Sequence, residues 1–185
     1  MKMKKKYILS LACVIGLAFS GTNAFAQYKI GDVILNPGVG LGYWYGSGGY
    51  ADFAAGIGVN AEFSCILDDI AIGPYLAFTR RTYSYSGYND DYTFIDFGAR
   101  GTYHFATLLK VKNENFDPYA GVFVGFVATS NDYDGTGGND VYDNRLQGGI
   151  YAGARWYFSD KFGVFGEVGL GGMYPLFLGV TFKLK

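Results

Sequence analysis

Residues 145–158 read RLQGGIYAGARWYF, and the alternation within this stretch decides the fold. One set of alternate positions is apolar or small, and the other set mixes glycine, tyrosine and charge. Such alternation predicts a β-strand, because successive side chains of a strand point to opposite faces. The apolar set is Leu146, Gly148, Ile150, Ala152, Ala154, Trp156 and Phe158, and the mixed set is Arg145, Gln147, Gly149, Tyr151, Gly153, Arg155 and Tyr157.

The same period of two recurs after residue 27, in segments of about ten residues. Gly, Asn, Asp and Ser occupy the breaks, as in GSGG at 46–49 and SDK at 159–161. Short connections favour antiparallel neighbours, so the pattern predicts an all-β fold, an eight-stranded antiparallel up-and-down barrel. The predicted strands are 33–45, 53–65, 70–85, 92–106, 119–130, 145–158, 162–171 and 176–184.

The direction of the apolar face decides which solvent surrounds the strands. A secreted lipocalin- or avidin-like barrel turns this face inward, whereas a membrane barrel turns it toward lipid. Here the mixed face is glycine with isolated charges, which suits the filling of a narrow tube better than a surface in water. The apolar faces run for about nine to eleven residues, enough to cross the hydrocarbon layer. Aromatic residues gather near strand ends, as in interfacial girdles, and include Tyr43, Trp44, Tyr45, Tyr83, Tyr85, Trp156, Tyr157 and Phe158. The sequence therefore favours a transmembrane barrel.

The first 26 residues have the features of a secretory signal peptide. Four lysines lie within residues 1–6, an apolar run follows up to Phe19, and residues 24–26 read AFA, an A-x-A cleavage site. The run is too short for a spanning helix, which needs about 20 apolar residues. A lipoprotein site at Cys13 is the alternative, but it would cut the apolar run short. We expect a signal peptide over 1–26 and a barrel domain over 27–185.

Charge and cysteine content exclude several classes of protein. The chain has 15 Lys and Arg against 16 Asp and Glu, and loss of four lysines with the signal peptide makes the mature chain acidic. No basic surface for nucleic acid is therefore expected. Aromatic residues make up 19% of the chain and charged residues 17%, which excludes a disordered protein. Cys65 is the only cysteine after residue 26, so no intramolecular disulfide is expected.

The glycine-aromatic pattern near the C-terminus resembles that of a known family. Residues 163–169 read GVFGEVG and residues 178–182 read LGVTF. With the signal peptide and eight alternating strands, they resemble the small outer-membrane β-barrel family that includes OmpX and the membrane domain of OmpA, often labelled porin family. The resemblance covers the whole mature chain. It implies location in the cell outer membrane of a Gram-negative envelope, with outer-membrane lipid, lipopolysaccharide and the barrel-assembly machinery as partners. The chain departs from the family in ending FKLK rather than in an aromatic residue.

The mixed faces predict a lumen filled by side chains. Eight strands enclose a space just wide enough for side chains, whereas water-filled porins use about 16 strands or more. Ions in such a space must be paired to offset their desolvation, so we predict a charge network rather than a conducting pore. For any single pair, a position at the rim in water is the alternative. The predicted network is Glu62, Arg81, Asp96, Arg100, Arg155 and Glu167, beside the bulky Tyr75, Tyr119, Phe123, Tyr151 and Phe165.

Turn positions predict which of these charges meet. A turn at 87–90 would place Arg81 opposite Asp96. A turn at 159–160 would place Glu167 beside Gly153 and diagonal to Arg155, within reach of a cross-strand pair.

The longest predicted connection runs from Asn131 to Asn144 and reads NDYDGTGGNDVYDN. With the N-terminus in the periplasm, this loop and the connection at 87–91 face outward, and 108–117 forms a periplasmic turn. The acids of the loop do not match an EF-hand, which needs a glycine at position six and a distal glutamate, so we expect a solvated loop rather than a calcium site. Loops on a rigid scaffold carry binding functions, so an extracellular partner is expected here. The predicted contact residues are Asp132, Tyr133, Asp134, Asp140, Tyr142 and Asp143.

Catalysis has little support in the sequence. The single histidine, His104, is predicted to point inward, with Thr102 as the nearest hydroxyl on the same face. A hydrolase needs an activated nucleophile and an orienting acid beside the histidine. No metal-ligand cluster, phosphate loop or dinucleotide fingerprint is present, because the Gly-x-Gly runs lie in strands and turns. We expect a structural, adhesive or envelope-protective barrel that is not an enzyme and needs no cofactor. A small channel for minor solutes and a lipid-modifying barrel enzyme are the alternatives.

Overall fold

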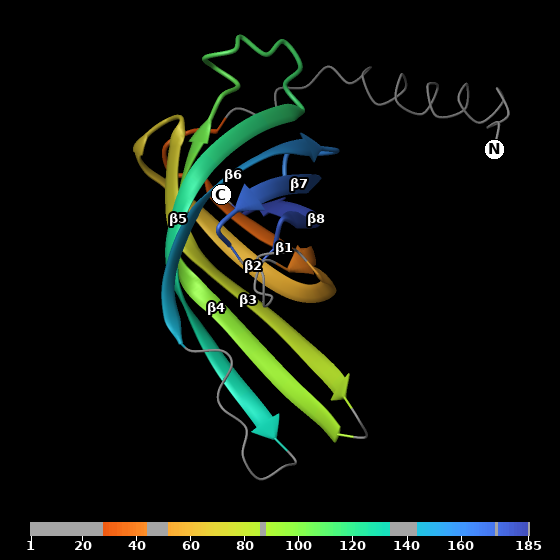
Figure 1. The fold of residues 1–185 in the computed structure, drawn as a ribbon. Coiled ribbons are helices and arrows are strands. Elements are labelled where there is room, and N and C mark those ends of the chain that lie inside the picture. Colours follow the sequence, from red (N-terminus) through yellow and green to blue (C-terminus); the bar gives the residue numbers. More distant parts are fainter. Residues whose placement is uncertain (1–27, 44–51, 86–87, 134–143, 173, 185) are drawn as a thin grey trace, which may run out of the picture.

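The computed structural model of the protein describes residues 28–43, 52–85, 88–133, 144–172 and 174–184. Within them, eight antiparallel strands form a closed barrel in sequence order, and β8 pairs with β1 (Figure 1). The strands are β1 (Val33–Tyr43), β2 (Asp52–Leu67), β3 (Ile70–Tyr85), β4 (Tyr88–His104), β5 (Phe116–Tyr133), β6 (Arg145–Tyr157), β7 (Phe162–Leu170) and β8 (Leu176–Lys183). The predicted all-β fold is therefore confirmed. The predicted signal peptide over 1–26 lies outside the described residues.

The two faces of each strand point as the alternation predicts. Leu146 is 75% exposed and Ile150 57%, whereas Arg155 on the same strand, β6, is fully buried. Every strand carries at least one large apolar side chain that is 40% or more exposed: Val39, Ile57, Leu76, Phe97, Val122, Ile150, Val168 and Leu178. Soluble proteins rarely expose an apolar surface of this extent, and a closed barrel pairs its backbone groups without water. The outer surface is that of a membrane-spanning barrel, and the secreted barrel with an inward apolar face is excluded.

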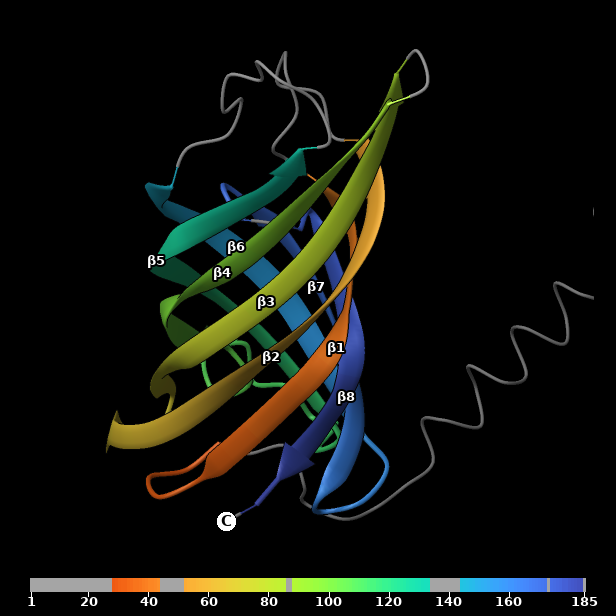
Figure 2. The same ribbon diagram turned by 90° about the horizontal axis from the view of Figure 1, so that it is seen from below.

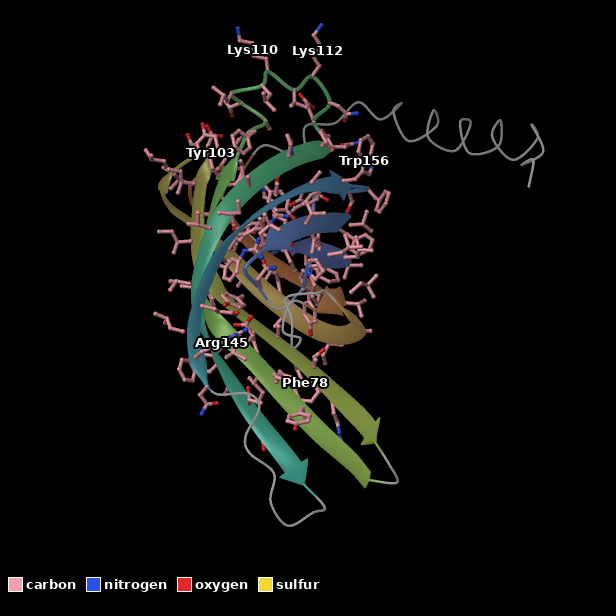
Figure 3. All side chains as sticks on the ribbon, viewed as in Figure 1. Phe78, Tyr103, Lys110, Lys112, Arg145 and Trp156 are labelled. Carbon is pink, nitrogen blue, oxygen red and sulfur yellow. The ribbon has the colours of Figure 1, made fainter. Side chains whose placement is uncertain are left out.

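Outward aromatic side chains form a girdle near one end of the barrel. The contacting pairs are Tyr103–Phe105, Phe116–Trp156, Phe158–Phe162 and Phe162–Phe182, with ring centroids 4.9 to 6.2 Å apart. Figure 3 shows Tyr103 and Trp156 at the end that carries the β4–β5 turn with Lys110 and Lys112. Tyr157, which was expected in this girdle, instead points inward and is 2% exposed. Trp44 and Tyr45 lie outside the described residues.

No helix among the described residues is long and apolar enough to cross a membrane.

The wall of the barrel has unequal height. Strands β7 and β8 have 9 and 8 residues, whereas β3, β4 and β5 have 16, 17 and 18. The pairing of β2 with β3 ends at Ile57 and Phe78, and that of β5 with β6 ends at Val127 and Arg145. Beyond these levels, residues 79–85, 88–94 and 129–133 form a three-stranded protruding sheet (Figures 1 and 2). We call its side the hairpin end, and the opposite side, where residues 28 and 184 lie, the terminal end.

The β3–β4 hairpin corrects one predicted register. Tyr85 pairs with Tyr88, so only residues 86–87 connect the strands, and β4 starts four residues earlier than predicted. Arg81 therefore pairs with Tyr92, and Asp96 pairs with Ala77; the predicted opposition of Arg81 and Asp96 is wrong. A two-residue connection is the commonest form of hairpin, and it shifts every pair in the ladder relative to the longer predicted turn.

β5 continues into the predicted outer loop, because β4 begins earlier than predicted and offers β5 more residues to pair with. Asn131, Asp132 and Tyr133 lie in β5, where Asp132 pairs with Asp91 and Tyr133 with Asp90. Ladder hydrogen bonds on β4 outweigh the low strand propensity of Asp and Asn. The remaining predicted contact residues, Asp134, Asp140, Tyr142 and Asp143, lie outside the described residues.

Candidate functional site

Buried charged side chains fill the terminal half of the lumen. Arg155 donates from Nη2 to Glu62 Oε1 at 2.5 Å and from Nη1 to Asp117 Oδ2 at 3.1 Å. His104 lies between the same two acids, with Nδ1 2.9 Å from Asp117 Oδ2 and Nε2 3.4 Å from Glu62 Oε2. All four side chains are at most 1% exposed. They come from β2, β4, β5 and β6, so the contacts join strands on different sides of the lumen.

A second ion pair lies next to this group, on the side toward the hairpin end. Arg100 donates from Nη2 to Glu167 Oε1 at 2.7 Å and from Nη1 to Glu167 Oε2 at 3.2 Å, a bidentate pair. Tyr151 accepts from Arg100 Nε at 3.0 Å, and Tyr119 donates to Glu167 Oε1 at 2.9 Å. Arg100 Nη2 is 4.0 Å from Glu62 Oε1, which connects the two groups. We call Glu62, Arg100, His104, Asp117, Arg155 and Glu167 the lumen plug.

Aromatic faces support both arginines of the plug. The guanidinium carbon of Arg100 lies 3.8 Å from the ring centroid of Tyr151, and that of Arg155 lies 4.2 Å from the ring of Tyr119. A desolvated cation over an aromatic face gains about 2 kcal/mol. Bidentate hydrogen bonds and ring contacts together offset the cost of keeping charge out of water.

The plug contains three carboxylates and two guanidinium groups. A third positive charge on His104 would bring its formal charge to zero, and both ring nitrogens of His104 already face carboxylate oxygens. No group of three or more His, Cys, Asp and Glu side chains among the described residues has the arrangement of a metal site. Thr102, the predicted nearest hydroxyl, is 2.6 Å from the hydroxyl of Tyr151. The geometry around His104 is therefore that of an ion-pair network, and no hydroxyl of the described residues forms a hydrogen bond to the ring.

Four of the six predicted network residues belong to the plug: Glu62, Arg100, Arg155 and Glu167. Glu167 lies opposite Gly153, as the turn at 159–160 predicts. It binds Arg100 across the lumen, however, and not the diagonal Arg155, because Glu62 and Asp117 already occupy both guanidinium ends of Arg155. Contacts across a narrow lumen thus replace the predicted contact between neighbouring strands.

The other two predicted residues lie outside the plug. Asp96 accepts a hydrogen bond from Tyr75 at 2.8 Å, farther toward the hairpin end. Arg81 is on β3 in the protruding sheet. Asp117 was missed because it was assigned to a turn, although it has the same parity as the inward Tyr119 two residues later. That parity was the signal that could have found it.

Tyr28 closes the terminal mouth of the barrel. Its ring stacks on His104 with centroids 3.9 Å apart and planes 10° from parallel, and the side chain is 5% exposed. The following residues are fixed across the mouth, because Ile30 N donates to Asp68 and Gly31 N donates to the carbonyl of Ser64. Burial, and next the negative charge of Glu62, raise the pKa of Tyr28 well above its ordinary value, so the hydroxyl stays neutral.

The hairpin half of the lumen is filled differently. Tyr174, from the β7–β8 turn, reaches across it and donates to the carbonyl of Phe78 at 2.8 Å, with Thr79 Oγ1 3.1 Å away. The Tyr174 ring lies directly against Gly40, where a Cβ would overlap it. Burial raises the pKa of Tyr174 to about 12. Between Tyr174 and the Arg100–Glu167 pair remains a cavity of about 90 Å³.

Fold and lumen together define a membrane-spanning β-barrel with buried ion pairs across its lumen. No protein-family model matches the chain, and no curated protein matches its sequence. Solved structures do match its fold. The outer membrane protein OprG of Pseudomonas aeruginosa superposes with a TM-score of 0.65 at 12% identity, over 86% of this chain and 99% of OprG.

Two further solved structures have a similar fold. Neisserial surface protein A gives a TM-score of 0.58 at 13% identity, over 83% of this chain and 97% of that protein. Ail, the attachment invasion locus protein of Yersinia pestis, gives 0.51 at 14% identity in its complex with the heparin analogue sucrose octasulfate, over 84% and 96% of the two chains. The chain therefore has the fold of the small eight-stranded outer-membrane β-barrels, and the resemblance seen in the sequence is confirmed at the level of the fold.

Proposed function

We propose that the protein is an integral outer-membrane barrel that does not conduct solutes and that acts at the cell surface, in a structural, adhesive or envelope-protective role. In this proposal the terminal end faces the periplasm and the hairpin end faces outward. A signal peptide over 1–26 is removed first, so that Tyr28 becomes the second residue of the mature chain and can enter the barrel mouth. N-terminal sequencing of the mature protein should begin at Gln27.

The lumen plug carries the proposal that the barrel is closed. Its ion pairs connect β2, β4, β5, β6 and β7 across the lumen, and the side chains of Arg155, Glu62 and His104 are at most 1% exposed. A solute could pass only by separating buried pairs, and leaving one buried charge without its partner costs about 3–5 kcal/mol. A permanently open path is therefore not expected.

Planar-bilayer recordings test this. The purified, folded protein should give no steady openings, and removal of both members of the central pair in Glu62→Ala/Arg155→Ala should introduce them. Steady openings on the nanosiemens scale from the unmodified protein would overturn the closed lumen and favour the small channel. The matched control is Lys112→Ala, a charge deletion at an exposed position in the β4–β5 turn.

The protruding sheet supports a role in surface contacts. Its β3 edge, residues 79–85, extends past the last residue that pairs with β2, and its β5 edge extends past the last residue that pairs with β6. A strand edge of this kind can accept an extended segment of a partner through main-chain hydrogen bonds. The loop from Asn131 to Asn144 begins within this sheet and remains the proposed contact region. The shared fold with Ail, whose name describes attachment, is consistent with such a role.

Protease treatment of intact cells tests topology and exposed surface together. Cleavage should be confined to the hairpin end, within 131–144, 86–91 and the β1–β2 connection. Cleavage within the β4–β5 turn at 105–115 in intact cells would invert the proposed orientation. Recovery of the processed chain as a compact monomer in the aqueous fraction, without detergent, would overturn the membrane location itself.

A further inference from the structure

A cavity of about 90 Å³ lies in the hairpin half of the lumen, next to the plug. Its floor is the Arg100–Glu167 pair. Aromatic side chains dominate its walls: Tyr75, Phe123, Tyr151, Tyr174 and Phe177. Glycines leave the space open, since Gly58 and Gly169 also line it.

Tyr174 forms the cover of this cavity. Its ring is parallel to that of Phe177, with 8° between the planes and 6.3 Å between centroids. Its hydroxyl is bound to the Phe78 carbonyl on the opposite wall, where the pairing of β2 with β3 ends. The turn that carries Tyr174 contains Gly171 at φ +87°, a backbone conformation that few other residues adopt. The contacts of the Tyr174 hydroxyl with Phe78 and Thr79, together with one ring contact, thus hold the cover in place.

The polar groups of the floor and walls are bound to one another. The Arg100 guanidinium is occupied by Glu167 and Tyr151, and Tyr75 donates to Asp96. A charged ligand would have to break these contacts, whereas a neutral ring can lie on the aromatic walls in offset or edge-to-face contact. We propose that this cavity binds a small neutral aromatic molecule and that Tyr174 closes over it.

The size of the cavity agrees with this class of ligand. One water needs about 10–15 Å³ of such a cavity, so the space holds either several waters or one substituted ring. Waters need two to four polar partners each, and aromatic walls offer few. The inference goes beyond the proposed surface role, because the ligand would rest on the plug without passing it.

A saturation experiment with 4-fluorophenol as probe tests the proposal, with fluorine NMR of the full-length mature protein in nanodiscs as the readout. The unmodified protein should bind the probe saturably. Gly169→Val should weaken binding at least about tenfold: a Cβ at Gly169 meets nothing closer than 3.4 Å, so the side chain can enter the cavity and fill it. The matched control is Gly101→Val, on the outward face of β4, where a Cβ meets no atom within 4 Å. Binding by Gly101→Val should equal that of the unmodified protein.

Photolabelling with 4-azidophenol gives a second readout that needs no variant. Labels should map to the cavity residues Tyr174, Phe177 and Tyr75, and excess 4-fluorophenol should suppress them. Equal binding by the unmodified protein and Gly169→Val, or labels spread over the lipid-facing surface only, would overturn the proposal and leave a water-filled cavity. These outcomes are independent of bilayer conductance, so failure of the cavity site and failure of the closed lumen can be distinguished.

Discussion

Both halves of the lumen are lined by the alternating inward positions of the strands, yet they are filled by different kinds of side chain. In the terminal half, ion pairs with buried partners fill the space, and Tyr28 covers them. In the hairpin half, aromatic rings and glycines enclose a cavity under a single tyrosine. Strand pairing holds the wall in both halves, so the difference lies in the side chains. We expect the terminal half to determine stability and the hairpin half to tolerate change.

The largest effect is expected from Arg155→Ala. The substitution leaves the carboxylates of Glu62 and Asp117 buried without their main partner, and such a loss costs about 3–5 kcal/mol. Urea unfolding in detergent micelles should show this loss in the free energy of unfolding. Lys112→Ala, at an exposed position of the β4–β5 turn, should change stability by less than about 0.5 kcal/mol. If the two substitutions lowered the free energy of unfolding equally, the terminal half would not determine stability as we expect.

Tyr28→Ala should cost less, about 2–3 kcal/mol, because it removes a buried ring and its stacking on His104 but leaves every ion pair intact. The same unfolding assay measures the cost. Exposure of the mouth should also speed amide hydrogen exchange around His104. Unchanged exchange there would show that Tyr28 does not close the mouth in the membrane.

Gly40→Ala tests the hairpin half and should cost about 1–3 kcal/mol, since its Cβ would overlap the Tyr174 ring. Tyr174→Ala should relieve most of that cost in the double variant, which identifies the ring as the source. Gly101→Ala, where a Cβ meets nothing within 4 Å, should be close to neutral. A persistent cost in the double variant would place the strain in the backbone instead.

The smallest effect is expected from Tyr174→Phe, about 1 kcal/mol for one hydrogen bond. Burial raises the pKa of Tyr174 from 10.0 to about 12, so the folded state favours the neutral hydroxyl. Its contribution is therefore complete below pH 10 and is lost as pH rises from 10 toward 12. The stability difference between the unmodified protein and Tyr174→Phe should shrink across that window. A constant difference would contradict a hydroxyl contribution.

The sequence predicted which side chains point into the barrel more reliably than it predicted which residues pair across strands. Alternation placed Tyr119, Tyr151 and Phe165 inside the barrel, because the direction of a side chain depends only on its parity within a strand. The pairing of Arg81 with Tyr92 could not be read in this way, since register depends on the length of one turn.

Partners within the plug were harder still to predict. Glu167 and Arg100 are separated by 67 positions in the sequence and face each other across the lumen, a contact that local pairing rules do not describe. Tyr174 lies between two strands, where alternation says nothing about direction. The inward set was therefore predictable, while the closure of the barrel at both ends depended on residues outside the strands.

The unequal strands have a consequence for the surrounding lipid. Eight residues of β8 extend about 26 Å, and tilting at about 40° reduces their height to about 20 Å, below the roughly 25 Å apolar band of such barrels. Acyl chains beside β7 and β8 must shorten or the barrel must lean, and each response has a modest energetic cost. The protein thus carries a thin sector on one flank, and fluorescence quenching by bromine placed at graded depths along the acyl chains would locate it.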